Sequence, residues 1–175
     1  MRMSEELFFE KLNRGELQAS DIAECLGRNY AMDRAIAGSS GVSEDTLERL
    51  AKSHDPGTRH QVILNVTTPA ASLIDLAAEF PLEFFSHPML DFMILEDPHL
   101  LNKLKPGVLK EFLKDPACPE SFLVWACRFG NKTDQLEILK RSDLKVEWLK
   151  FIAQGAHPKP AERAMDRLIE MGEEW

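Results

Sequence analysis

Residues 46–77 read TLERLAKSHDPGTRHQVILNVTTPAASLIDLA, and this stretch contains one pattern twice. The triplet Leu-x-x-Leu-Ala occupies residues 47–51 and returns at residues 73–77, 26 positions later. Positions i, i+3 and i+4 lie on one side of an α-helix, since successive side chains rotate by about 100°. Each copy therefore predicts a short helix with one apolar stripe.

The same stripe recurs along the chain. Copies begin at residues 22, 47, 73, 123 and 149. The copy expected near residue 98 is missing, and the chain there has the leucine-rich segment LEDPHLLNKLKPGVLKEFL. This spacing predicts about six units of 25–26 residues, of which the fourth is degenerate. A short helix cannot bury its stripe alone, whereas stacked units can, so a repeat of this length is typical of a helical-repeat solenoid.

Prolines between the stripes predict where the helices begin. Proline fits the first turn of a helix, and an Asp or Thr before it can cap the helix. We expect two helix starts per unit and an all-α chain, because only QVILNV at residues 61–66 has an ambiguous strand pattern. The glycines and serines at residues 38–41 predict a linker. The proline pairs are Asp55-Pro56, Thr68-Pro69, Phe80-Pro81, His87-Pro88, Asp97-Pro98, Lys105-Pro106, Asp115-Pro116 and Cys118-Pro119.

The repeats over residues 20–80 resemble the leucine-rich repeat variant family of HEAT- and armadillo-like bacterial proteins. Its motif runs approximately Thr-Pro, Leu-x-x-Leu-Ala, Asp-Pro, Val-Arg-x-x-Val-Ala-x-Asn-Pro, Thr-Pro. The residues that match it in order are Leu47, Leu50, Ala51, Asp55, Pro56, Arg59, Val62, Asn65, Thr68 and Pro69. The resemblance implies a right-handed superhelix in which α-helices alternate with 3₁₀-helices in two layers.

We predict one domain over residues 1–175, with an N-terminal helix or cap at 1–19, repeats at 20–158 and a capping helix at 159–175. Some members of the family carry an amino-terminal iron–sulfur domain with clustered cysteines. In this chain Cys25 is alone in that half, so the resemblance does not extend to that cofactor. We expect no cofactor.

Charge and composition narrow the choice of partners. The chain has 21 basic and 29 acidic residues and a formal charge of −8, which repels a phosphate backbone and makes nucleic acid an unfavourable main partner. The amino-terminal residues lack an uninterrupted apolar core for a signal peptide, and no apolar stretch reaches the length of a membrane span. We therefore expect a cytoplasmic protein with reduced thiols and no membrane contact.

Few residues suggest chemistry. Cys127 occupies a position that is alanine in three other repeats, which predicts a small buried side chain, whereas Cys118 at a helix start could be a reactive thiol. Arg59 could bind an acidic partner group, but we expect it to tie a loop carbonyl or a nearby acid such as Asp33 or Glu48. The five histidines are not spaced as a metal site. We predict no catalytic residue and no metal.

Aromatic residues gather in the carboxy-terminal repeats. Phe122 and Trp148 are 26 residues apart, as are Trp125 and Phe151. Phe122, Trp125 and Phe129 follow the spacing i, i+3 and i+7, which places them on one face of a helix. These five residues are the candidate interaction site, since an exposed apolar patch with tryptophan would favour partner binding.

The alternative is an inter-repeat seam. In this interpretation the last helix covers the aromatic residues with Met165, Leu168 and Ile169. The two hypotheses stay open at this stage.

Two functions follow from the pattern. A non-enzymatic protein–protein interaction scaffold is favoured, because solenoids present long curved surfaces. The alternative is an enzyme or nucleic-acid-acting protein comparable to the DNA glycosylases built from HEAT-like repeats. A cluster of six or more Lys and Arg side chains on the concave face would favour the second hypothesis.

Overall fold

A computed structural model describes residues 3–173, and all of its regular elements are helices. The prediction of an all-α chain is confirmed for these residues, and the ambiguous segment 61–66 continues the helix before it as far as Leu64. The chain divides into two compact units, the first ending at Asp91 and the second beginning at Phe92. The single domain over residues 1–175 stays a prediction.

Short helices fill both units, with the boundary inside α8 (Leu90–Glu96). The helices of the first unit are α1 (Glu5–Arg14), α2 (Ala19–Cys25), α3 (Tyr30–Ala37), α4 (Glu44–Leu50), α5 (Pro56–Leu64), α6 (Ala70–Leu76) and α7 (Pro81–Phe85). Those of the second are the 3₁₀-helix η1 (Leu100–Lys103), α9 (Val108–Lys114), α10 (Glu120–Phe129), α11 (Lys132–Ile138), α12 (Val146–Ala153) and α13 (Pro158–Glu170).

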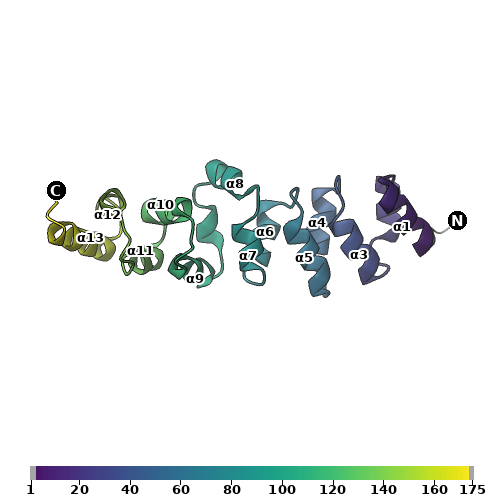
Figure 1. The fold of residues 1–175 in the computed structure, drawn as a ribbon. Coiled ribbons are helices and arrows are strands. Elements are labelled where there is room, and N and C mark those ends of the chain that lie inside the picture. Colours follow the sequence, from purple (N-terminus) through teal and green to yellow (C-terminus); the bar gives the residue numbers. More distant parts are fainter. Residues whose placement is uncertain (1–2, 174–175) are drawn as a thin grey trace. The chain divides into compact units, whose positions relative to one another are not determined.

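Helices two apart along the chain pack against each other. In the first unit α3 contacts α1 and α5, and α5 contacts α7. In the second unit α11 contacts α9 and α13, while α10 contacts α12. Figure 1 shows α9, α11 and α13 in one row of the second unit, with α10 and α12 in the other. Contacts between alternate helices are thus present in both units.

The predicted apolar stripes form the core. The large residues of the four regular triplets are buried: Leu47, Leu50, Leu73, Leu76, Leu123, Leu149 and Ile152. The small residues that end these triplets are buried as well, except Ala51, which is partly exposed. In the looser first copy only Cys25 is fully buried. The predicted burial is therefore confirmed at these positions.

The prediction that each proline pair begins a helix is correct at some sites only. Pro56 begins α5, and the Asp55 carboxylate accepts a hydrogen bond of 2.7 Å from the Thr58 backbone N–H, as a capping residue should. After Thr68 the helix begins one residue later than predicted, at Ala70. The Thr68 hydroxyl donates to the carbonyl of Val62 instead of capping α6, so the predicted Thr cap is wrong.

Two Asp-Pro pairs form turns before a later helix. Asp97 accepts from the His99 N–H at 3.0 Å and is followed by η1, and Asp115 accepts from the Ala117 N–H at 2.8 Å. A side chain that bonds the backbone two residues ahead closes a turn rather than a helix. Among residues 3–173, η1 is the single 3₁₀-helix, so the regular alternation of α- and 3₁₀-helices implied by the family resemblance is not found.

A side-chain clamp recurs between neighbouring repeats. Its donor reaches back to two backbone carbonyls that lie 28 and 26 residues earlier, at distances of 2.7 to 3.0 Å. Five of these carbonyls lie at or after helix ends and accept no backbone hydrogen bond within the described residues, so the clamp satisfies groups that would otherwise need water; that of Asp115 also accepts from the Cys118 N–H at 3.0 Å. The clamps run from Asn65 to Ala37 and Ser39, from Arg141 to Leu113 and Asp115, and from Arg167 to Leu139 and Arg141.

The buried His87 makes the first unit sensitive to acid. Its Nδ1 accepts from the Met89 N–H, which leaves the proton on Nε2, where it is donated to the carbonyl of Asn65 at 3.3 Å. Burial lowers the pKa of His87 below its ordinary value of 6.5. Unfolded His87 takes up a proton as the pH falls through about 6.5, whereas folded His87 does not, so the free energy of unfolding falls in this range.

We expect His87→Gln to reduce this loss, because glutamine can supply a donor and an acceptor but does not titrate. Urea unfolding of both proteins at about pH 7.5 and 5.5 measures the effect. Equal losses of unfolding free energy for the wild type and the variant would contradict the assignment.

Candidate functional site: a lysine-lined pocket in the second unit

The five candidate aromatic residues are mostly interior. Phe122, Trp125 and Trp148 are each 5% exposed, Phe151 is half-buried and Phe129 is 38% exposed. A continuous aromatic surface patch is therefore absent from this part of the described structure. Contact of Phe129 or Phe151 with a partner stays a prediction.

Neighbouring helices and loops cover the aromatic rings. The indole N–H of Trp125 donates to the carbonyl of Pro98 at 2.7 Å, and the Phe122 ring packs edge-on against Phe112 at 5.2 Å between centroids. Cations lie over the other two rings, Lys145 over Trp148 and Arg128 over Phe151. These contacts lie within the second unit and fit an inter-repeat seam.

The last helix does not cover the stripe in the predicted way. Leu168 of α13 is buried, but Met165 is 37% exposed and Ile169 is 71% exposed. The prediction that all three residues bury the aromatic side chains is therefore wrong for Met165 and Ile169. Because α13 packs mainly against α12, its outer face turns to solvent.

The three cysteines are free and buried. Desolvation raises the pKa of Cys118 to about 11 and that of Cys127 to about 12. The prediction of a small buried side chain is confirmed for Cys127. The idea that a helix start lowers the pKa of Cys118 is wrong, because loss of water outweighs the helix dipole there.

Arg59 is held within the fold as expected, but by a different acid. Its guanidinium donates to both carboxylate oxygens of Glu79, at 2.6 and 2.8 Å, and to the carbonyl of Ser53. The acids proposed from the sequence, Asp33 and Glu48, do not take part in these contacts. Asp33 instead accepts a hydrogen bond from the backbone N–H of Gly27. The loop-carbonyl part of the prediction is confirmed.

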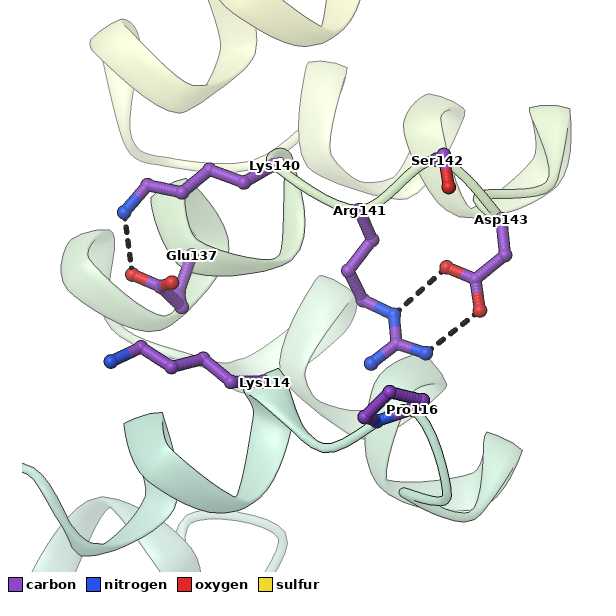
Figure 2. A pocket seen from close by; sticks show the side chains of 7 residues that line it. All are labelled: Lys114, Pro116, Glu137, Lys140, Arg141, Ser142 and Asp143. Atoms are coloured by element: carbon purple, nitrogen blue, oxygen red, sulfur yellow. Dashed lines mark hydrogen bonds and ion pairs between the residues drawn. The ribbon is translucent and has the colours of Figure 1, made fainter.

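A pocket opens in the second unit, at the ends of α9 and α11 and the loops that follow them. It has a volume of about 400 Å³ and is lined by polar and charged residues: Lys114, Pro116, Glu137, Lys140, Arg141, Ser142 and Asp143. Figure 2 shows the side chains of Lys114 and Lys140 flanking Glu137, with Arg141 and Asp143 forming the opposite wall.

A buried carboxylate forms the floor between the lysines. Glu137 is 7% exposed, and its Oε2 lies 2.8 Å from Lys140 Nζ and 3.8 Å from Lys110 Nζ. The hydrogen bond from Lys140, together with the charges of Lys110 and Lys114, lowers the pKa of Glu137 below its usual range. Glu137 is thus ionised at neutral pH and its charge is more than matched by three ammonium groups.

The opposite wall is rigid because one arginine makes four hydrogen bonds. Arg141 donates from Nε and Nη2 to the two oxygens of Asp143, at 2.9 and 2.7 Å. Its Nη1 makes the clamp to the carbonyls of Leu113 and Asp115 described above. Arg141 therefore shapes the pocket.

A second hollow of about 250 Å³ shares Lys140 and adds Arg163 and Arg167 of α13. We name the cations along α9, the end of α11 and α13 the basic track: Lys110, Lys114, Lys140, Arg141, Arg163 and Arg167. Four carboxylates lie among them: Glu111, Glu137, Asp143 and Asp166. The track contains six cations, the number that the nucleic-acid hypothesis requires on a concave face, but the four acids offset most of their charge and the concave face stays a prediction.

The basic track stands out against an acidic chain. The first unit holds 8 Lys and Arg against 15 Asp and Glu, and the second holds 13 against 14. The members of the track are far apart along the chain, so local sequence patterns do not bring them together. The repeat register could have found it, since Lys114 and Lys140 are 26 residues apart, as are Arg141 and Arg167.

No protein-family model, no curated protein and no solved structure matches the chain. Within residues 3–173, no helix combines the length and apolar character needed to cross a membrane. In the same part of the chain, no three His, Cys, Asp or Glu side chains are grouped so that they could hold a metal ion.

Proposed function

We propose that the protein is a helical-repeat scaffold that binds a protein partner and carries out no reaction itself. The repeats would form a right-handed solenoid, and the partner would bind along one of its helix layers. The observation that supports this most is the clamp found at three places, whose donor bonds carbonyls 28 and 26 residues earlier, since that distance matches the length of one predicted repeat.

The packing of alternate helices gives further support. A helix that contacts its neighbours two positions away in both directions belongs to a layer that can continue from repeat to repeat, as α3 with α5 and α11 with α13 do. Such a layer presents side chains from successive repeats side by side, which is how solenoids build extended binding surfaces. The basic track is a surface of this kind in the second unit.

The test is capture followed by reconstitution. The tagged chain would retain proteins from a native lysate, and each candidate would then be purified and titrated against the free chain by calorimetry. We expect one candidate to bind with a fixed stoichiometry. The proposal fails if no purified candidate binds, or if binding shows no defined stoichiometry.

The nucleic-acid alternative is kept because the basic track contains six cations. A direct comparison uses the same calorimeter, with single-stranded and duplex DNA in place of the protein candidate. Tight binding of DNA at about 0.15 M salt, with a steep loss at higher salt, would favour the alternative.

A further inference from the structure

We propose that the basic track binds an extended acidic segment of the partner, with a carboxylate of that segment seated between Lys114, Lys140 and Ser142. This inference rests on the proposed function, because it names the kind of partner surface that the scaffold would recognise. Its supports are the free donors of the pocket, the local excess of positive charge and the continuation of the track over three helices.

The pocket offers hydrogen-bond donors that the fold leaves unused. An ammonium group has three donors. Lys140 spends one on Glu137 at 2.8 Å, and Lys114 spends one on Glu111 at 2.6 Å. Ser142 is exposed, and its hydroxyl makes no hydrogen bond to any residue in the described range 3–173. These donors come from the two sides of one hollow, so an oxygen ligand could accept from both.

The acids of the pocket are already neutralised. Asp143 is held by two hydrogen bonds from Arg141, which lower its pKa, and Glu137 lies among three lysines. Glu111, the partner of Lys114, is 70% exposed, so water screens that ion pair and it contributes little. The remaining unbalanced charge near the pocket is cationic and selects an anionic group.

The shape of the track favours an extended ligand over a small anion. The two hollows share Lys140, so cations of α9, of the loop after α11 and of α13 line neighbouring hollows. Asp166 lies in the second hollow and would repel a ligand of continuous charge. Acidic residues separated by neutral ones suit this alternation of charge.

A protein segment fits better than a nucleic acid. DNA carries a phosphate charge about every 1.7 Å of its axis and would bring its negative charge against Glu111, Asp143 and Asp166. A short acidic peptide carries fewer charges and can place them next to the lysines only.

The test measures binding of a fluorescent peptide of about twelve residues that alternates Glu and Ser, with its Gln and Ser counterpart as the neutral probe. The full chain and Lys114→Glu/Lys140→Glu are compared by fluorescence anisotropy at about 0.05 and 0.15 M salt. Lys132→Glu/Lys159→Glu is the matched control. It makes the same charge change on exposed lysines of the second unit that lie outside the track.

We expect the acidic peptide to bind the wild type and the control, and to bind the track variant at least about tenfold more weakly. Because Lys140 supports the buried Glu137, Lys114→Gln/Ser142→Asp serves as a second variant that keeps this ion pair. Absence of peptide binding, equal binding to all variants, or tighter binding of a single-stranded oligonucleotide of equal charge would each overturn the inference.

The outcome is separable from that of the proposed function. A purified partner that binds wild type and track variants equally leaves the scaffold proposal standing and overturns the inference alone. Failure of every purified candidate to bind overturns the scaffold proposal, whatever the peptide does.

Discussion

Replacing Leu73 or Leu123 by alanine is expected to lower the free energy of unfolding by about 2–5 kcal/mol. Both side chains are buried, Leu73 in the first unit and Leu123 in the second, and each removal leaves a cavity that the surrounding helices fill only partly. Urea unfolding followed by circular dichroism measures the change in each unit.

Two exposed leucines provide the control. Leu82 and Leu95 are 74% and 78% exposed, so their replacement by alanine should change the unfolding free energy by less than about 0.5 kcal/mol. If Leu73→Ala and Leu123→Ala left the unfolding midpoint where it is in the wild type, the repeat register would be wrong.

Replacing Trp125 by alanine is expected to cost about 3–5 kcal/mol, because a buried tryptophan contributes packing over a large area. The variant also leaves the carbonyl of Pro98 without its 2.7 Å hydrogen bond. The same unfolding measurement gives the cost. Trp125→Phe separates the two contributions, since it keeps most of the apolar contact and loses only the N–H donor.

Phe129→Ala is the matched control on the same helix. Its ring is 38% exposed and contacts Trp125 and His99 at the edge of the core, so we expect a smaller loss than at Trp125. If Trp125→Ala removed partner binding at unchanged stability, the aromatic residues would form the interaction site and the assignment to the core would be wrong.

The sequence predicted the helix faces well because local periodicity decides them. Leu47 and Leu149 each begin a triplet with the spacing i, i+3 and i+4, which an α-helix places on one side. Both residues are buried. Helix starts were harder to predict, since the same Asp-Pro pair caps α5 at Asp55 but closes a turn at Asp97.

Most contacts of the candidate site could not be predicted from the sequence. Arg59 pairs with Glu79, 20 residues away, and the basic track joins Lys114 to Lys140 across two helices. Such neighbours depend on how repeats stack. The burial of Trp125 depends in the same way on the carbonyl of Pro98, 27 residues earlier.

The most direct test of the central claim is lysine acetylation of the chain with and without its reconstituted partner, read by mass spectrometry. A partner held on the basic track should protect Lys114 and Lys140, which are 43% and 64% exposed in the free chain, and leave Lys132 and Lys159 as reactive as before. Unchanged acetylation of Lys114 and Lys140 in the complex would contradict the account.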